Sequence, residues 1–296
     1  MTDDVQLTII VPVFNRDESL RRAIATIVPQ SDRVSVVIVD DGSAPEFAAV
    51  IDELAAIRGS VVQVIHQPNR GPAAARNAGL SVTSSPFVMF LDSDDELVET
   101  SFAAINGDLL QRDDVGMVCG AIRIVSLSGE LRATKQPTAA PGVPWAKLNW
   151  LPGSFIVRTD VAHAVGGYDE ALHFAENTDF VLRLAEECRR RSLVVAATSD
   201  PFSVHYVAPD ERRYDAKRLE AAIHLLRRGR FDLEIPSERA KLHAIAAVNA
   251  GRVGRYGLAV RHAALAALAE PRNPRHLARL AFSLSGPIAR RHWLRT

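Results

Sequence analysis

Short apolar runs and longer amphipathic segments alternate regularly through the first third of the chain. Four runs are rich in β-branched residues, as strands buried on both faces are: residues 7–14, 34–43, 61–67 and 86–95. The segments between them have helical spacing: residues 16–28, 46–58 and 71–82. Because strand–helix alternation with short connections favours right-handed βαβ units, we predict an α/β fold with a mostly parallel sheet and flanking helices.

The pattern becomes less regular after residue 97. Residues 115–126 and 129–134 predict a hairpin, and a loop rich in Pro, Ala and Gly leads into 154–160. A helix at 176–191 is followed by a strand at 193–198. From about residue 210 the spacing is helical throughout, in four segments: up to 228, 237–250, 257–269 and 274–293. We therefore expect one α/β domain over residues 1–230 and a helical extension over 231–296.

Composition and charge narrow the class of protein. The chain has 296 residues, 47% of them hydrophobic, which suffices for a large buried core. Its formal net charge is zero, so no bulk attraction to nucleic acid is expected. Cys119 and Cys188 lack the spacing of a zinc site. The first ten residues carry acids where a signal peptide needs bases, and no apolar run approaches a membrane span. A cytoplasmic location is expected.

Polar residues gather where the predicted strands end, at Asn15, 40–43 and 92–95. In an open α/β sheet the carboxyl ends of the strands border the ligand crevice. The segment 92–95 holds three aspartates that repel one another unless a cation or water intervenes. Mg²⁺ and Mn²⁺ bind carboxylate oxygens and share their remaining positions with substrate phosphates. The alternatives are a chance Asp-x-Asp pair and, at 40–43, an ordinary Asp-Gly turn.

The segment NRGPAAARNAGL, residues 69–80, predicts the start of a helix at Gly71 and Pro72. Arg76 lies one turn further on. A guanidinium and a helix N-terminus together suit an anion. The alternative is an alanine-rich packing helix with a solvated arginine.

The motifs VPVFNR, IVDDGS, NRGPAAARNAGL and FLDSDD follow one another in this order, and GGYDE, ENTDFVLRL and PFSVHY come after them. This arrangement resembles the family 2 glycosyltransferases of the GT-A fold over about residues 5–230. The resemblance implies inverting transfer of a sugar from a nucleotide diphosphate-sugar to an acceptor hydroxyl, assisted by Mn²⁺ or Mg²⁺. The acceptor is a saccharide, a lipid-linked compound, a peptide or a natural product.

The resemblance also implies roles for individual residues. The nucleotide would be bound at the strand ends by Pro12, Val13, Asn15, Asp40, Asp41, Arg76, Asp92 and Ser93. The metal would be bound by Asp94, Asp92 and His205. His205 taken alone is equally typical of a buried strand histidine. The acceptor would lie against Trp145, Trp150, Gly153 and Ser154, and two tryptophans near a loop are also typical of a packing cluster.

The general base departs from the family pattern. Relatives carry Glu-Asp at the start of the helix after the GGYDE motif, and the aspartate serves as base. This chain has Glu176 and Asn177, and an amide cannot take a proton. Glu176 or Asp179, which share a helix face, would then act as base. The alternatives are an acceptor that ionises easily, a weak or inactive protein that only binds sugar nucleotides, and acids that merely complement the helix dipole.

Residues 271–296 contain six arginines and no acid. Leu277, Leu280, Ala281 and Leu284 form an apolar stripe there. This helix either docks on the rest of the protein or rests on an anionic membrane at its inner face. A further alternative for the whole chain is a sugar-phosphate nucleotidyltransferase, which has a glycine-rich basic loop after its first strand; VPVFNRDES has none.

Overall fold

The computed structural model describes eight stretches of the chain: residues 5–27, 33–58, 61–98, 112–137, 151–172, 175–207, 215–228 and 236–286. Contacts divide the chain into two compact units. The first, the α/β unit, comprises residues 1–171 and 176–208, and the second, the helical unit, comprises 172–175 and 209–296. Trp145 and Trp150, the expected acceptor residues, lie outside the described residues.

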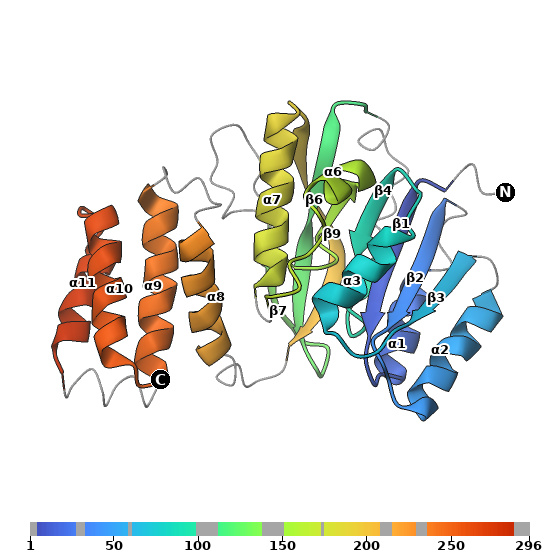
Figure 1. The fold of residues 1–296 in the computed structure, drawn as a ribbon, viewed down its shortest axis with the longest axis horizontal. Coiled ribbons are helices and arrows are strands. Elements are labelled where there is room, and N and C mark those ends of the chain that lie inside the picture. Colours follow the sequence, from blue (N-terminus) through green and yellow to red (C-terminus); the bar gives the residue numbers. More distant parts are fainter. Residues whose placement is uncertain are drawn as a thin grey trace. The chain divides into compact units, whose positions relative to one another are not determined.

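The described strands of the α/β unit form one nine-stranded sheet (Figure 1). They are β1 (Leu7–Val13), β2 (Val34–Asp40), β3 (Val62–His66), β4 (Phe87–Phe90), β5 (Glu96–Leu97), β6 (Val115–Ser126), β7 (Leu131–Lys135), β8 (Phe155–Arg158) and β9 (Val194–Val207). Their order is β3-β2-β1-β4-β8-β6-β9-β5, with β7 paired to β6. The first four strands are parallel, as predicted, but β8 runs antiparallel between β4 and β6, so the sheet as a whole is mixed.

Helices cover both faces of this sheet (Figure 1). They are α1 (Glu18–Ile27), α2 (Pro45–Arg58), α3 (Pro72–Ser81), α6 (Thr159–Ala164) and α7 (Glu176–Arg190). Successive strand residues point to opposite faces. Ile9 of β1 therefore packs in the core under α1 and α2, whereas Ile10 packs in the core under α3, α6 and α7. Burial on both faces explains why these strands are apolar at nearly every position.

Two elements of the α/β unit differ from the sequence prediction. The strand expected at 86–95 ends at Phe90, because residues 92–95 form a turn closed by a 3.0 Å hydrogen bond from the Asp95 N–H to the Asp92 carbonyl. The short helix α6 was not predicted. The hairpin of β6 and β7 is confirmed.

The helical unit contains α8 (Asp215–Arg228), α9 (Pro236–Arg252), α10 (Tyr256–Ala269) and α11 (Pro274–Leu284). A core of small side chains joins the first three: Leu219, Ala222, Ala246, Ala250 and Ala259. Alanines at these positions allow the helices to approach closely. Helix α8 packs in this core, so the division between the units falls after residue 208 and not at the expected residue 230.

The apolar stripe expected on α11 is largely exposed. Leu277 is 48% exposed and Leu284 is 64% exposed, whereas His276 and Ser283 are buried. The helix thus turns a polar face inward. Within the described part of the chain, no helix is long and apolar enough to cross a membrane.

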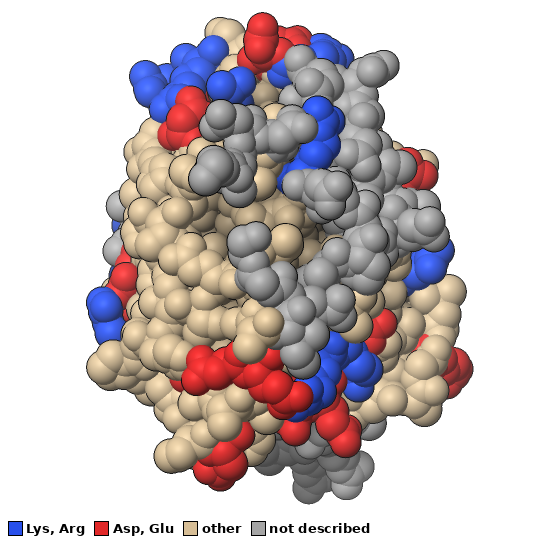
Figure 2. All heavy atoms as spheres, turned by 90° about the vertical axis from the view of Figure 1, so that its right-hand side faces the viewer, with Lys and Arg blue, Asp and Glu red and all other residues tan. Residues whose placement is uncertain are grey.

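The face of the protein in Figure 2 carries its described acidic and basic side chains in separate small groups, mainly toward the top and the bottom of the view.

The contact between β6 and β9 gives a direct test of the fold. A Cβ atom at Gly120 of β6 would lie 2.3 Å from the ring carbons of the fully buried Phe202 in β9. We expect Gly120→Ala to lower the free energy of unfolding by about 1–3 kcal/mol, because the packed ring cannot move away freely. Denaturant titration followed by circular dichroism measures this change.

Gly257→Ala serves as the control, because a Cβ atom there meets no atom within 4 Å. It lies in a helix, α10, and we expect it to raise stability by about 0.5–1 kcal/mol. Equal effects of the two substitutions would contradict the close contact of Gly120 with Phe202.

Candidate active site

Three strand ends meet at one edge of the sheet. In the parallel register, Val13 of β1 lies beside Asp40 of β2. The Asp41 N–H donates to the Val13 carbonyl at 2.8 Å, and the Leu91 N–H donates to the Ile10 carbonyl at 3.0 Å. The loops after β1, β2 and β4 therefore begin side by side, and they carry the polar residues that the sequence analysis singled out.

Asp41 fixes the loop that leads into α3. Its carboxylate accepts the backbone N–H groups of Arg70 at 2.9 Å and Gly71 at 2.8 Å, and the side-chain amide of Gln67 at 2.7 Å. The residue is only 4% exposed. Its carboxylate thus acts mainly on the protein's own backbone and positions the N-terminus of α3.

Asp40 is likewise held from within. It accepts the Ser43 N–H at 2.9 Å and lies 2.9 Å from Nδ1 of His66. Burial by itself would raise the pKa of Asp40, but the hydrogen bonds from Ser43 and His66 hold that pKa below its usual value. The same contact with Asp40 raises the pKa of His66.

Asn15 connects the first two loops. It has a positive φ of 51°, which asparagine tolerates better than most residues. Its N–H donates to Ser43 Oγ at 2.9 Å, and its side-chain oxygen accepts the Ala44 N–H at 2.8 Å. Pro12 and Val13, just before it, are buried in β1. These residues shape the edge of the sheet, and Asn15 itself is exposed.

Arg76 lies at the centre of the site. Its side chain is 3% exposed, and it donates to Asp92 at 2.6 Å and to Glu176 at 3.1 Å. Because a buried cation needs counter-charges, these two carboxylates raise the pKa of Arg76 against the effect of burial. The guanidinium thereby joins the turn after β4 to the first turn of α7. The alternative of a solvated arginine on a packing helix is excluded.

The ring of Tyr168 supports this guanidinium from one side. Its centroid lies 5.1 Å from the Arg76 guanidinium carbon, within cation–π range. The ring also stacks on Phe180 and meets the edge of Phe90. Tyr168 lies inside the GGYDE motif, but no feature of the sequence indicated that its ring would contact Arg76.

Glu176 and Asn177 differ in which side-chain oxygens have hydrogen-bond partners. One oxygen of Glu176, Oε1, accepts from both Arg76 and the Asn177 amide, the latter at 2.9 Å. The side chain of Glu176 remains 14% exposed. The carbonyl oxygen of Asn177 is buried and has no hydrogen-bond partner among the described residues. Asn177 therefore orients Glu176 and keeps one acceptor atom unused.

Asp179, the other candidate base, points into the protein. Its side chain is 2% exposed and pairs with Arg183 at 2.7 Å. Arg183 in turn donates to the carbonyls of Val165 and Gly167. This ion pair anchors α7 to the segment after α6, and Asp179 has no open path to an acceptor. Shared helix spacing with Glu176 was not sufficient to give the two carboxylates the same environment.

The turn at residues 92–95 separates its acids into two kinds. Asp92 is 33% exposed, and Asp94 is 49% exposed with Arg16 at 3.5 Å. Asp95 is 4% exposed and turns inward, and Ser93 is also buried. The cluster therefore presents two carboxylates outward, whereas the third lies in the interior.

Asp95 binds His205, one of the expected metal ligands. Asp95 lies 2.7 Å from Nδ1 of His205, and Nε2 lies 2.9 Å from the Pro152 carbonyl. A carbonyl only accepts, so Nε2 carries a proton, and the neighbouring carboxylate raises the pKa of the ring. Both ring nitrogens are engaged inside the protein. His205 is thus placed as a buried strand histidine, and no ring nitrogen is presented to a metal.

The remaining carboxylates fit one kind of divalent-metal site and not another. The described residues contain no group of three His, Cys, Asp or Glu side chains that could enclose an ion. Asp94 and Asp92 do offer partly exposed carboxylates at a strand end. A hard cation that also binds substrate phosphates and water needs only one or two protein carboxylates. The residues fit such a shared site, and they do not fit an all-protein one.

Gly153 and Ser154, expected near the acceptor, form a tight turn against β4. The Gly153 N–H donates to the Phe90 carbonyl at 2.5 Å, and its φ of 76° favours glycine. A Cβ atom there would lie 2.9 Å from the side chain of Ser203. Ser154 is fully buried. These two residues therefore fix the backbone beside the strand end.

The ionic cluster around Arg76 can be tested by stability. We expect Arg76→Met to cost about 3–5 kcal/mol, because it leaves Asp92 and Glu176 facing each other without a cation. Adding Glu176→Gln to this variant is expected to restore part of the loss, since one of the opposed charges is removed. Denaturant midpoints of the single and double variants measure the coupling, and strictly additive effects would contradict the proposed network.

Comparisons with known proteins show the family to which the chain belongs. The family model Glycosyl transferase family 2 matches residues 8–168, more than half of the chain. The chain is 32% identical over 193 residues to the pre-mycofactocin glycosyltransferase of Mycobacterium tuberculosis. That match covers 61% of this chain and 39% of the relative, so the chain spans about two fifths of the relative's length.

Solved structures with low sequence identity share the fold. TarS of S. aureus, residues 1–349 in complex with UDP-GlcNAc, has a TM-score of 0.64 at 17% identity, covering 97% of this chain and 90% of that one. The mannosyltransferase PcManGT of Pyrobaculum calidifontis, in complex with GDP-Man and Mn²⁺, has a TM-score of 0.55 at 20% identity, covering 98% and 84%. The fold and the family match together set aside the sugar-phosphate nucleotidyltransferase. The chain belongs to the glycosyl transferase family 2 and has the GT-A fold with a helical C-terminal region.

Proposed function

We propose that the protein transfers a sugar from a nucleotide diphosphate-sugar to an acceptor hydroxyl, with inversion at the anomeric carbon and with Mn²⁺ or Mg²⁺. One observation carries this proposal. Buried Arg76 connects Asp92, in the acidic turn after β4, to Glu176, at the start of α7. Asp92 would lie near the metal and the diphosphate, and Glu176 would take the proton of the acceptor hydroxyl. Arg76 therefore joins the two residues in one cluster.

The nucleotide is proposed to lie over the loops that follow β1 and β2. Asn15 is an exposed polar residue there, and Asp40 and Asp41 hold the two neighbouring backbones in place. TarS was solved with UDP-GlcNAc and PcManGT with GDP-Man. These two donors therefore lead the panel to be tested, with dTDP-sugars beside them.

Asp94 and Asp92 are the residues that would hold the divalent metal. When bound, such an ion supplies Lewis-acid stabilisation of the negative charge that develops on the departing diphosphate. Asp92 is already oriented by Arg76. Arg16 lies beside Asp94 and is available to attract the phosphates.

Glu176 is proposed as the general base. Its Oε1 is used by Arg76 and Asn177, so the proton of the acceptor hydroxyl would go to Oε2. Asp179 is omitted from the proposal because it is buried with Arg183. The attack from the face opposite the leaving group inverts the sugar.

A second candidate is a protein that binds sugar nucleotides without transferring them. Two features favour it: Asn177 stands where relatives carry the base, and one carboxylate oxygen of Glu176 is already engaged by Arg76 and Asn177. Thermal-shift measurements with UDP-GlcNAc and GDP-mannose, with and without Mn²⁺, detect binding by either candidate. Only transfer or donor hydrolysis distinguishes them.

The base is tested by Glu176→Gln. We expect a loss of transfer of roughly 10²–10⁴-fold with donor binding retained, because the amide of glutamine cannot take the proton of the acceptor hydroxyl. Release of nucleoside diphosphate measures the rate. Glu130→Gln, an exposed residue beside β7 in the hairpin, is the control. Asn177→Asp reports on the second candidate: a large gain in rate would show that the natural site is weakened, and no change would favour Glu176 as the working base.

The metal ligands are tested by Asp94→Asn. Because the diphosphate charge would lose its counter-ion, we expect a decrease in transfer of about a hundredfold or more and a weaker dependence on added manganese. Chelation of metal from the native protein should have a similar effect. Asp114→Asn, an exposed aspartate paired with Arg112, is the matched control. Full activity of Asp94→Asn in the presence of a chelator would contradict the metal assignment.

A further inference from the structure

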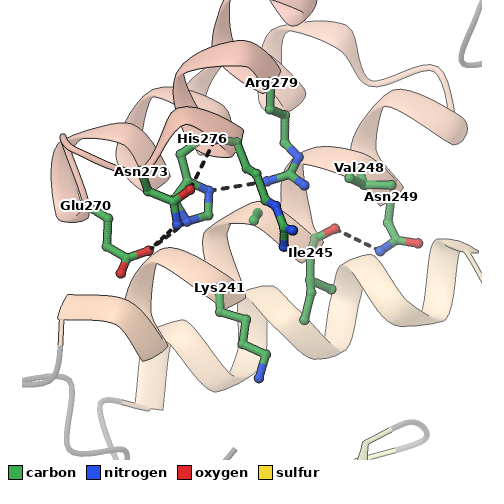
Figure 3. A pocket seen from close by; sticks show the side chains of 10 residues that line it. Lys241, Ile245, Val248, Asn249, Glu270, Asn273, His276 and Arg279 are labelled. Carbon is green, nitrogen blue, oxygen red and sulfur yellow. Dashed lines mark hydrogen bonds and ion pairs between the residues drawn. The ribbon is translucent and has the colours of Figure 1, made fainter.

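The helical unit contains a pocket of about 480 Å³ between α9 and α11 (Figure 3). Its lining comes entirely from this unit: Lys241, Ala244, Ile245, Val248 and Asn249 of α9, Glu270 and Asn273 of the connection to α11, and Arg275, His276 and Arg279 of α11. Figure 3 shows Arg279 reaching from α11 over Ile245 of α9, with His276 beside it.

The pocket has an excess of positive charge. Among the described lining residues, the bases are Lys241, Arg275 and Arg279, and Glu270 is the one carboxylate. Glu270 is already used, because it accepts from Asn273 at 3.0 Å and lies 2.9 Å from Nε2 of His276. Among the described residues, neither arginine forms an ion pair with a carboxylate.

Arg279 is a partly buried cation in this pocket. Its guanidinium makes one contact of 3.3 Å with Nδ1 of His276. Partial burial disfavours its charged form and lowers its pKa. Since a partly buried cation is stabilised by an opposite charge, an anion in the pocket would offset this cost.

The other walls suit a ligand that is more than a bare anion. Ala244, Ile245 and Val248 provide apolar surface along α9. Asn249 is 5% exposed; its amide donates to the Ile245 carbonyl at 2.8 Å, while its side-chain oxygen has no partner in the part of the chain that the structure describes. That oxygen is itself buried, so the part of this wall that a ligand larger than a bare anion would contact is the apolar surface of α9.

The arginines of α11 face this pocket and do not flank the exposed apolar stripe. At about 100° per residue, Arg275 and Arg279 lie on the opposite side of the helix from Leu284 and Leu277. The arginines line the pocket with α9, and the two leucines do not. The positive charges of Arg275 and Arg279 are therefore better placed for a ligand inside the pocket than for a flat membrane in contact with Leu277 and Leu284.

We propose that the pocket between α9 and α11 binds the phosphate group of a phosphate ester. Arginine forks match phosphate oxygens in pairs, and the pocket is larger than a bare phosphate ion requires. The ester is either a soluble metabolite or the headgroup of a lipid. This site is separate from the residues proposed for sugar transfer and does not depend on that proposal.

Binding to the full chain tests the proposal. The soluble probe is glycerol 3-phosphate, measured by titration calorimetry with glycerol as the uncharged control. The lipid probe is a phosphatidylcholine vesicle with and without phosphatidic acid, measured by sedimentation. Each is compared among the native protein, Arg275→Gln, Arg279→Gln and Arg272→Gln. Arg272 is the matched control, because it carries the same charge three residues before Arg275 but does not line the pocket.

We expect Arg275→Gln and Arg279→Gln each to weaken binding about tenfold or more, as for loss of one hydrogen bond to a charged group, with Arg272→Gln close to the native protein. Binding of phosphatidic acid vesicles without binding of glycerol 3-phosphate would identify a lipid ester. Equal weakening by all three substitutions, or no binding of either probe, would overturn the proposal. Arg275 is exposed, so its variant retains the fold if Arg279→Gln does not.

Discussion

The candidate active site depends on one buried guanidinium. Arg76 is almost inaccessible to water and is opposed by Asp92 and Glu176, which lie 16 and 100 residues from it in sequence. Removing a cation from water is costly, and the close carboxylates and the ring of Tyr168 offset that cost. The same interaction that stabilises the arginine therefore brings the sheet edge and the start of α7 together, and it fixes the orientation of both acids.

Acids that are close in sequence in this site differ in burial: some are partly exposed, and others are buried in ion pairs. Asp92 and Asp94 face outward, whereas Asp95 pairs with His205 in the interior. Glu176 borders the site, whereas Asp179, one helical turn later, is buried with Arg183. An ionised carboxylate that stays partly hydrated can exchange its partners for a substrate or a metal, but one that is buried in an ion pair holds the backbone in place.

The core of the helical unit is made of smaller side chains than the core of the α/β unit. Its core consists largely of alanines, so the helices approach closely and little large apolar surface is buried. Helix α11 turns His276 inward and leaves Leu277 and Leu284 exposed. His276 is held by Glu270, and both line the pocket that also receives the arginines of α11. Neither arginine forms an ion pair with a carboxylate among the described residues, and this supports the proposed phosphate site.

The sequence by itself determined the family, the α/β fold and the convergence of the strand-end loops, because these depend on the local order of apolar runs and on motif spacing. It also identified Arg76, Asp92, Asp94 and Glu176 as candidates. Only the tertiary structure decided which acids face outward, that both nitrogens of His205 are engaged, that β8 makes the sheet mixed and that the polar side of α11 faces inward. The physical reason is that the protonation and accessibility of a side chain depend on neighbours that can be 100 residues or more away in sequence, as for Arg76 and Glu176, and spacing along the chain does not specify those neighbours.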